Sequence, residues 1–562
     1  VSFCELSTEV TAVPSMSVRF DLRLAVLVFV RLTCTSHARR LPARSEQTQY
    51  GKRHDLRSAA GTASRLNSLV EVGQSHVARR ALSNIFMGLD PSSSFNPSAP
   101  GTQSPAGRKN RRTVSSLRRA TEKKMGIDST SFDSAEAHTG WLAKQDGLPQ
   151  GFAVGTAKLS FTPEEAPEMA AKMDLTLIKA DEPTASFAAV TTSSKFPGAP
   201  VKVLRRRLQE PLAQAIVINN KVSNVCPSGD GEADAEYICA AVAKALEMDG
   251  AKLVLPSSTG VIGWKLPVAA MEAALPDAAA ALQVNDMLPA AKAIMTTDRY
   301  PKLRSRTLSN GARVVGIAKG AGMIEPNMAT MLSYVLTDLA IPRDTLREAV
   351  SAAAAASFNC ISVDSDESTS DMLVCLSSGK KKASSSDVEE FQGALLEVCQ
   401  ELARDIVRNG EGTQHVIQVG ITNANKLSGQ EMRDLGRAVV NSPLFKCAVA
   451  GNDPNVGRLV GAIGKCAGRL HLDVDPDKVT IKLGGAIIYE KGSFSLDGDM
   501  EKKLSNILKD AMMPPEAPYP VHERVVDIEV DLGHGGGTEA SVMVWGSDLT
   551  KEYVSINADY RS

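Results

Sequence analysis

The chain has 562 residues and a formal net charge of −1, with 43% hydrophobic, 23% charged and 4% aromatic residues. This is the composition of a globular protein with room for about two to four folded units, and it excludes a fibre or a wholly disordered chain. No apolar run approaches the roughly 20 residues that a membrane-spanning helix needs, so we expect no contact with a membrane.

The near-neutral charge conceals a basic start and an acidic remainder. Residues 1–125 contain 20 Lys and Arg against 8 Asp and Glu, whereas the remaining chain contains 43 against 56. An acidic body with few aromatic side chains matches nucleic acid poorly, so we expect no nucleic-acid binding. The nine cysteines are scattered without a Cys-x-x-Cys pair, and the eight histidines do not cluster with them. This distribution argues against a disulfide framework and against a metal site.

Residues 1–125 have the features of a targeting leader. The sequence opens with Val1, and we expect translation to start at Met16; a basic stretch, the apolar residues 24–30 and the small residues 36–38 then follow in the order of a secretory signal. The stretch after them is rich in Arg and Ser and poor in acids, as in an organellar transit peptide. We predict a disordered leader that directs the protein to the plastid (chloroplast) stroma, with the mitochondrial matrix as the alternative.

Beyond residue 126, short apolar runs alternate with amphipathic ones. These patterns predict strands at 215–218, 252–255, 313–318 and 334–341, and helices at 232–249 and 342–358. The second helix is expected to carry Pro342 in its first turn. Residues 257–263 form a small-residue turn whose backbone amides can face a ligand. This mixture favours an α/β architecture of layered sheets covered by helices.

The segment 318–332 concentrates small residues around Thr330, which follows a constrained Pro-Asn turn. A threonine hydroxyl is a weak nucleophile and needs a base. If Thr330 becomes the first residue of a new chain, its own α-amine, with a reference pKa of about 7.7 to 8.0, serves as that base. The alternative is that Thr330 is an ordinary strand residue and that the glycines only permit close approach of the backbone.

Two other segments resemble functional loops less well. His534 and the three glycines after it look like a phosphate or oxyanion loop, but no helix signal follows them, and we predict a hairpin turn there. Residues 364–367 are acidic, as in a calcium loop, but they lack the glycine and the distant glutamate of an EF-hand at the required offsets. We therefore predict no calcium site.

The segment 318–332 resembles the self-cleavage motif of the ornithine acetyltransferase family, the bifunctional glutamate N-acetyltransferases of arginine biosynthesis. The resemblance covers roughly residues 145–562. Further motifs occur in the order and spacing of the family at residues 148–152, 293–298, 357–359, 453–458, 545–550 and 556–562. So many ordered matches do not arise by chance.

The resemblance implies a layered α/β/β/α sandwich and a precursor that cuts itself between Ala329 and Thr330. Residues 126–329 then form an α chain, and residues 330–562 form a β chain that begins with the nucleophile Thr330. The implied reaction moves an acetyl group from N2-acetylornithine to glutamate through an acetyl-threonine enzyme, in a ping-pong order, and gives ornithine and N-acetylglutamate. The two chains are expected to assemble as an α2β2 heterotetramer.

The functional residues of the family match individual positions of this chain. The oxyanion hole corresponds to Thr259 and Gly260, and one such donor is typically worth about 10² to 10³ in rate. The substrate contacts correspond to Thr296, Lys319, Thr330, Glu411, Asn557 and Ser562. The resemblance implies no metal and no bound cofactor, and acetyl-CoA stays open as a further acetyl donor. Taken alone, Lys319 and Glu411 are more typical of solvated surface charges.

The chain departs from the family pattern at several positions. Residues 219–224 keep only part of an asparagine-rich run, and Ser365, Ser370, Val456 and Ser562 stand where Gly, Asn, Trp and Thr are usual. Two alternative functions remain, and only the second of them draws support from these departures. One is an amidase or aminopeptidase of related fold, in which water accepts the acyl group; the other is a binding or scaffold protein that stays a single uncut chain.

Overall fold

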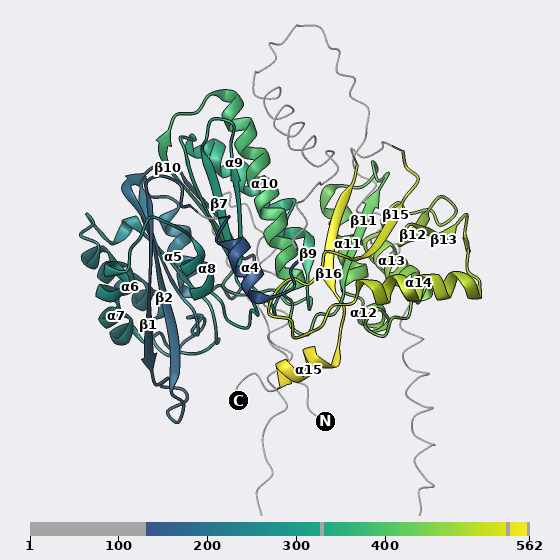
Figure 1. Cartoon of the computed structure of the whole chain (residues 1–562), viewed down its shortest axis with the longest axis horizontal. Helices are drawn as coiled ribbons and strands as arrows, with labels where there is room; N and C mark the ends of the chain where they lie inside the picture. Colours follow the sequence, from purple (N-terminus) through teal and green to yellow (C-terminus); the bar gives the residue numbers. More distant parts are fainter. Residues whose placement is uncertain (1–130, 146, 326–330, 536–539, 559–562) are drawn as a thin grey trace, which may run out of the picture. The chain divides into compact units, whose positions relative to one another are not determined.

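The computed structural model describes residues 131–145, 147–325, 331–535 and 540–558 (Figure 1). The chain divides into two units, Val1–Thr102 and Gln103–Ser562, and every described residue belongs to the second. The leader predicted for residues 1–125 lies outside the described residues, as do Ala329, Thr330 and Ser562. None of the helices in the described part of the chain is both long and apolar enough to cross a membrane.

The first sheet has four strands in the order β1-β2-β4-β5. They are β1 (Phe152–Phe161), β2 (Ala171–Thr184), β4 (Ala213–Asn219) and β5 (Val254–Ser258). The pairs β1-β2 and β2-β4 are antiparallel, whereas β4 and β5 are parallel. A parallel pair needs a crossover, which contains α6 (Gly231–Ala245). Asp230 caps this helix, because its carboxylate accepts hydrogen bonds from the N–H groups of Glu232 and Ala233.

The second sheet has five strands in the order β3-β10-β8-β7-β6. They are β3 (Phe187–Thr191), β10 (Met372–Lys381), β8 (Leu332–Leu339), β7 (Arg313–Lys319) and β6 (Lys302–Thr307). The central strand β8 is parallel to β10 and antiparallel to β7. All eight residues of β8 are buried, as expected for a strand that is covered on both faces.

The two sheets pack face to face. Ile178 and Ile216 of the first sheet and Ile317 and Leu336 of the second are fully buried in one cluster, and the Tyr334 hydroxyl donates a hydrogen bond of 2.6 Å to Ser257 Oγ. The helices α6 and α7 (Val268–Ala280) cover the outer face of the first sheet. The helices α9 (Arg343–Ala355) and α10 (Ser385–Arg408) cover the outer face of the second. This arrangement confirms the predicted α/β/β/α sandwich.

A third sheet of seven strands follows in the chain, in the order β14-β13-β12-β15-β11-β16-β9. Its strands are β9 (Ile361–Ser362), β11 (Val416–Thr422), β12 (Thr480–Leu483), β13 (Ala486–Glu490), β14 (Ser493–Phe494), β15 (Val526–Asp531) and β16 (Val542–Ser547). Leucines of α11 (Gly429–Val440), α13 (Val456–Leu470) and α14 (Gly498–Ala511) complete its core. Trp545 of β16 is buried in the cluster around α10 instead, so α10 lies between the second and third sheets (Figure 1).

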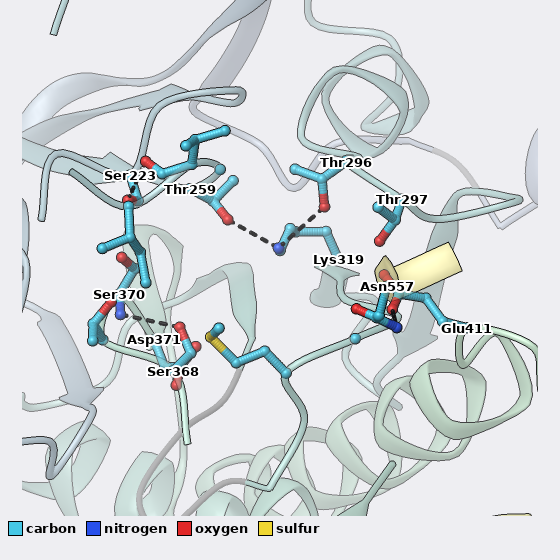
Figure 2. Close-up of a pocket in the computed structure, with 16 residues that line it drawn as sticks. Ser223, Thr259, Thr296, Thr297, Lys319, Ser368, Ser370, Asp371, Glu411 and Asn557 are labelled. Atoms are coloured by element: carbon cyan, nitrogen blue, oxygen red, sulfur yellow. Dashed lines mark hydrogen bonds between the residues drawn. The ribbon is translucent and has the colours of Figure 1, made fainter. Parts of the chain in front are cut away.

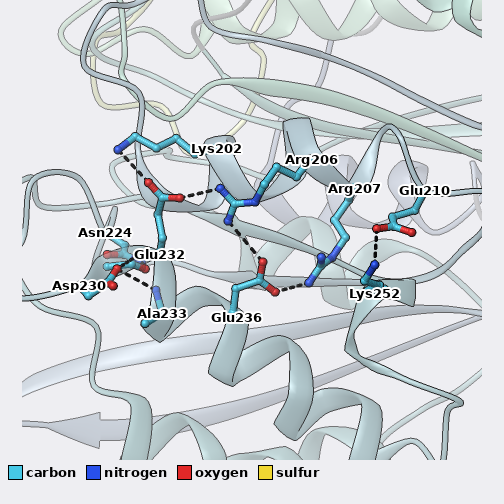
Figure 3. A network of polar contacts seen from close by, with 11 residues as sticks. Lys202, Arg206, Arg207, Glu210, Asn224, Asp230, Glu232, Ala233, Glu236 and Lys252 are labelled. Carbon is cyan, nitrogen blue, oxygen red and sulfur yellow. Dashed lines mark hydrogen bonds and ion pairs between the residues drawn. The ribbon is translucent and has the colours of Figure 1, made fainter.

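Shorter helices complete the described part of the chain. They are α4 (Ala135–Leu142), α5 (Ala199–Arg207), α8 (Leu288–Ala293), α12 (Pro443–Ala450) and α15 (Lys551–Ala558), with 3-10 turns at Ala251–Leu253 and Phe358–Cys360. Ion pairs join α5 to α6 (Figure 3): Arg206 reaches Glu232 at 2.6 Å and Glu236 at 3.3 Å. The Arg206 side chain is half exposed, so each of these two pairs stabilises the fold by at most about 1 kcal/mol.

The predicted strands at 215–218, 313–318 and 334–341 are confirmed as β4, β7 and β8, with small shifts at their ends. The strand predicted at 252–255 begins only at Val254, after a 3-10 turn.

The two predicted helices form with shorter bounds. α6 ends at Ala245 because Leu246 caps it and Glu247 adopts a left-handed φ of 52°. α9 begins after Pro342, since that residue has an extended ψ of 141° and is the N-cap.

The hairpin predicted around His534 is wrong. β15 and β16 lie on opposite sides of β11, the first parallel to β11 and the second antiparallel to it. The connection between them therefore joins two strands that are not neighbours, and residues 536–539 within it lie outside the described residues. Glycines indicate that a turn is sterically possible, but they do not determine which strands become neighbours.

Candidate active site

One pocket of about 350 Å³ gathers most of the predicted site residues (Figure 2). It lies where β5 continues into residues 259–262, where β7 ends at Lys319, and where residues 368–371 lead into β10. The other residues that line it are Ser223, Thr296, Thr297, Gly322, Met323, Glu411 and Asn557. The structure thus brings together Thr259, Gly260, Thr296, Lys319, Glu411 and Asn557, which the sequence motifs singled out individually. The volume of this pocket suits a small molecule.

Lys319 and Thr259 are joined by a hydrogen bond at the centre of the pocket. The Lys319 ammonium donates to Thr259 Oγ1 at 2.9 Å and to Thr296 Oγ1 at 3.4 Å. The Thr259 N–H donates to the carbonyl of Asn219 at 3.0 Å and is therefore occupied. Because Lys319 supplies a proton to the Thr259 oxygen, the hydroxyl keeps its own proton for another acceptor. Thr259 is placed to act through its side chain.

Gly260 needs to be a glycine in this turn. Its φ is +129°, and a Cβ at this position would meet the backbone of Lys221 at 2.1 to 2.6 Å. Any other residue would therefore force the turn apart. The Gly260 N–H makes no hydrogen bond to a residue that the structure describes. The Thr259 hydroxyl and the Gly260 N–H are thus two neighbouring donors that line the same pocket, which is the arrangement an oxyanion requires.

Asp298 lies behind the wall of the pocket and fixes the backbone of two residues beside it. Its buried carboxylate accepts hydrogen bonds from the N–H groups of Thr296 at 3.0 Å and Gly320 at 2.7 Å, and it pairs with the buried ammonium of Lys302. Burial alone would raise the pKa of Asp298, but the charges of Lys302 and Lys319 outweigh burial and hold it below its ordinary value. Asp298 therefore stays ionised and fixes Thr296 relative to the end of β7.

Glu411 lines the pocket together with Asn557 of α15. It is only 8% exposed, and its Oε2 accepts a hydrogen bond of 2.9 Å from Asn557 Nδ2 of α15. Gly322 packs so closely on it that a Cβ would lie 2.3 Å from Glu411 Oε2. The expectation that such a glutamate is solvated on the surface is wrong, because the residues around it are too far away in the sequence for the local pattern to reveal its burial.

Asp364 holds the chain segment that precedes the predicted cleavage site. Its carboxylate accepts hydrogen bonds from the N–H groups of Met323 at 2.7 Å and Ile324 at 2.8 Å, and the Tyr553 hydroxyl of α15 donates to it at 3.2 Å. In addition, the Glu325 N–H donates to the carbonyl of Asp366 at 3.1 Å. This acidic segment therefore binds backbone and tyrosine donors. Across the described residues, no group of three His, Cys, Asp or Glu side chains could hold a metal ion.

Ala329, Thr330 and Ser562 lie outside the described residues. On the carboxyl side of Thr330 the description resumes at Met331. Leu332 then pairs with Lys319 on one side and with Met372 on the other. The start of β8 therefore lies between β7 and β10. Lys319 at the end of β7 and residues 368–371 just before β10 both line the pocket.

Several pocket residues had no signal in the sequence. Ser368, Thr369 and Asp371 line the pocket beside the predicted residues. Ser223, Met323 and Ser370 line it as well, and the sequence drew attention to them only through the segments 219–224 and 318–332 and, for Ser370, through a departure from the family pattern. Asp371 is the one buried carboxyl in this group.

Comparison with known proteins agrees with the motifs. The profile of the ArgJ family matches residues 165–562. The arginine biosynthesis bifunctional protein ArgJ of Bartonella quintana is 39% identical over 402 residues, which cover 70% of this chain and 92% of that protein. The arginine biosynthesis bifunctional protein ArgJ 2 of a Nostoc species is 38% identical over 387 residues, covering 69% and 93%.

Two solved structures are also similar. The crystal structure of the arginine biosynthesis bifunctional protein ArgJ from Bacillus halodurans has 33% identity and a TM-score of 0.35, covering 41% of this chain and all of that one. The Mycobacterium tuberculosis ornithine acetyltransferase in complex with ornithine has 29% identity and a TM-score of 0.29, covering 33% and 97%. The family profile spans more than half of the chain, and the curated relatives are covered over most of their length. The chain therefore belongs to the ArgJ family, the ornithine acetyltransferase family that its motifs resemble.

Proposed function

We propose that this ArgJ-family acyltransferase moves the acetyl group of N2-acetylornithine to glutamate and so produces ornithine and N-acetylglutamate for arginine biosynthesis. The observation that carries the proposal is that one pocket holds Lys319, the neighbouring Thr259 hydroxyl and Gly260 N–H, and the Glu411–Asn557 pair. The relatives named for arginine biosynthesis and the ornithine complex of a family member support the choice of substrates.

The proposal includes self-processing between Ala329 and Thr330. Cleavage there would turn Thr330 into the first residue of a new chain, residues 330–562, and leave residues 126–329 as the other. Two features support it: Asp364 fixes the backbone of Met323 and Ile324 before the cut, and β7 and β10 fix Leu332 after it. A peptide bond between two anchored segments is a suitable target for a neighbouring hydroxyl.

In the first half-reaction, Thr330 Oγ attacks the acetyl carbonyl of N2-acetylornithine. The α-amine of Thr330 takes the hydroxyl proton, the acetyl C–N bond breaks, and the ornithine amine leaves with a proton, so an acetyl ester remains on the threonine. Negative charge develops on the carbonyl oxygen as Oγ attacks. The Thr259 hydroxyl and the Gly260 N–H are the donors proposed to stabilise that oxygen.

In the second half-reaction, the neutral amine of glutamate attacks the acetyl ester. The ester C–O bond breaks and the acetyl group is transferred to the glutamate nitrogen. That nitrogen loses a proton, and the threonine oxygen gains one and becomes a hydroxyl again. Acetyl-CoA is proposed as a further donor that would acetylate the same threonine, as a substrate and not as a resident cofactor.

The substrate contacts proposed are Thr296, Lys319, Thr330, Glu411, Asn557 and Ser562. The charges of the described ones suit an amino acid, because Lys319 offers an ammonium to the α-carboxylate and Glu411 offers a carboxylate to the N–H of the α-nitrogen that both substrates carry. Glu411 and Asn557 come from different parts of the chain and meet only in the folded pocket.

We further propose an α2β2 assembly of the two processed chains and import into the plastid stroma, with the mitochondrial matrix as the competing destination. The basic, acid-poor composition of residues 1–125 supports import. A fluorescent fusion of this leader tests the destination directly, and sedimentation of the purified protein tests the assembly.

Intact-mass spectrometry of the full chain under denaturing conditions tests the catalytic proposal, before and after brief exposure to N2-acetylornithine. We expect two fragments divided at Ala329 and Thr330, with one acetyl group gained on the second fragment and removed by glutamate. Loss of the acetyl group to water at the same rate without glutamate would favour the amidase alternative. A single uncut chain that never gains an acetyl group would favour the scaffold alternative.

A further inference from the structure

Asp371 is a buried carboxyl group that lines the pocket and has no part in the proposed chemistry. It is 3% exposed and lies directly before β10. Backbone hydrogen bonds of 3.0 Å hold it on both sides, from Thr192 N–H to the Asp371 carbonyl and from Met372 N–H to the Met331 carbonyl. Its position is therefore fixed by the second sheet. Figure 2 places it across the pocket from Thr297 and Glu411.

One oxygen of this carboxyl group lacks a partner. Asp371 Oδ2 is inaccessible to solvent and makes no hydrogen bond to any residue that the structure describes. Burial raises the pKa of Asp371 well above its ordinary value, although contacts with Ser368 and the charge of Lys319 act in the opposite direction and Glu367 adds to the rise. A buried carboxyl oxygen is stable only with a proton, a cation or a hydrogen-bond donor beside it. Asp371 Oδ2 can therefore accept a hydrogen bond or an ion pair from a bound molecule.

The other charged groups of the pocket already have partners. Lys319 donates to Thr259 and Thr296, and Glu411 accepts from Asn557. The two proposed substrates share an α-carboxylate and an α-nitrogen but differ at the side-chain end, which is an ammonium group in N2-acetylornithine and a carboxylate in glutamate. A single site must accept both ends in turn. A group that can be charged or neutral meets that requirement, whereas a fixed charge of either sign does not.

We propose that Asp371 binds the side-chain end of both amino-acid substrates, as a carboxylate facing the ammonium group of N2-acetylornithine and as a carboxylic acid donating to the side-chain carboxylate of glutamate. This inference rests on the proposed function of the pocket. With ornithine bound, the opposite charge favours the ionised carboxyl group. With glutamate bound, a second negative charge at the same place favours the protonated one, so that the two carboxyl groups share one proton.

The sharpest test uses N2-acetylnorvaline, which keeps the carbon chain of N2-acetylornithine and lacks its side-chain amine. For wild-type protein we expect kcat/KM for N2-acetylornithine to exceed kcat/KM for N2-acetylnorvaline by about 10- to 100-fold, as one charge-assisted hydrogen bond allows. In Asp371→Asn this ratio should fall to about 1. Because the ratio compares two substrates on the same preparation, a reduced fraction of active enzyme does not affect it.

Asp338→Asn is the matched control. Asp338 is also a buried carboxyl group of the second sheet, but it lies outside the pocket and accepts hydrogen bonds from the N–H groups of Arg313 and Gln150. Its substitution should leave the substrate ratio at the wild-type value. An unchanged ratio in Asp371→Asn would overturn the inference. Absence of acetyl transfer in the wild type would overturn the proposed function instead, so the two failures are distinguishable.

The pH dependence of the wild type provides a second, independent measurement in case Asp371→Asn does not fold or process. As the pH rises, Asp371 ionises, so the preference for N2-acetylornithine over N2-acetylnorvaline should increase. The preference for glutamate over glutamine as acceptor should decrease over the same range. Lys319 and Glu367 are the charged groups that act on Asp371. They affect the rates with both donors alike and the rates with both acceptors alike, so they cancel in each ratio. Two ratios that do not change with pH, or that change in the same direction, would overturn the inference.

Discussion

Lys319 and Thr259 come from different sheets of the sandwich, and a hydrogen bond of 2.9 Å joins them at the rim where both sheets end. Lys319 is the last residue of β7, and Thr259 follows directly after β5. The contact therefore spans the two layers and sets the orientation of the Thr259 hydroxyl. The catalytic consequences can be tested residue by residue.

Thr259→Val removes one of the two proposed oxyanion donors and keeps the shape of the side chain. We expect kcat/KM for acetyl transfer to fall by about 100- to 1000-fold, because the charge on the carbonyl oxygen loses a positioned donor. Single-turnover acetylation followed by mass spectrometry measures this. Thr176→Val is the matched control: Thr176 Oγ1 is buried in the first sheet without a partner among the described residues, so this change should leave the rate unaltered. Wild-type rates in Thr259→Val would exclude its hydroxyl from the oxyanion site.

Gly322→Ala should weaken substrate binding without touching the nucleophile. The added Cβ would lie 2.3 Å from Glu411 Oε2, so the Glu411 carboxylate must move away from Asn557. We expect KM to rise about tenfold or more, as for loss of a charge-assisted contact. Gly461→Ala, in α13 with no atom within 4 Å of the new Cβ, should instead stabilise the protein by about 0.5 to 1 kcal/mol. Steady-state kinetics and thermal unfolding separate the two effects.

Asp364→Asn should slow self-processing. The side chain keeps its size but loses the negative charge that holds the N–H groups of Met323 and Ile324, and such charge-assisted bonds are roughly twice as strong as neutral ones. We expect the uncut chain to persist about tenfold longer, measured by denaturing gel electrophoresis during synthesis. Tyr553→Phe removes only the tyrosine contact to Asp364 and should have a smaller effect. Processing of Asp364→Asn at the wild-type rate would contradict this role.

Asp298→Asn should destabilise the fold at neutral pH. It leaves the buried ammonium of Lys302 without its ion partner, which costs about 3 to 5 kcal/mol for a buried pair. The pKa of Asp298 is lowered in the folded state, because Lys302 and Lys319 outweigh burial. The carboxylate therefore stabilises the protein above its unfolded pKa of about 3.9 and loses this contribution as the pH falls below that value. Denaturant unfolding between pH 3 and 7 should show a shallower acid decline in Asp298→Asn than in the wild type.

The sequence predicts the architecture well where a pattern is local. Short apolar runs in the sequence predict the strands β4, β7 and β8. The resemblance to the family predicts that the sheets form an α/β/β/α sandwich. The motifs also single out Thr259, Lys319 and Glu411 individually, but only the fold brings β5, β7 and the residues after α10 to one rim.

Other features depend on contacts between distant residues and could not be predicted. Glu411 is buried by Gly322 and Asn557, which are far from it in the sequence. Asp371 carries no local signal, because an aspartate before a strand is usually solvated. The turn at His534 was predicted as a hairpin because its glycines favour a tight turn, whereas β15 and β16 are separated by β11.

The strand order of the second sheet has a further consequence. In the order β3-β10-β8-β7-β6, a cut before Thr330 would leave β3, β7 and β6 on one polypeptide and β8 and β10 on the other, interleaved at the β3-β10 and β8-β7 contacts. The two pieces could then separate only by dismantling the sheet. If the proposed cut occurs, it would have to follow folding, and unfolding of the processed protein would separate two chains. Refolding of the processed protein should then depend on protein concentration, whereas refolding of the uncut chain should not.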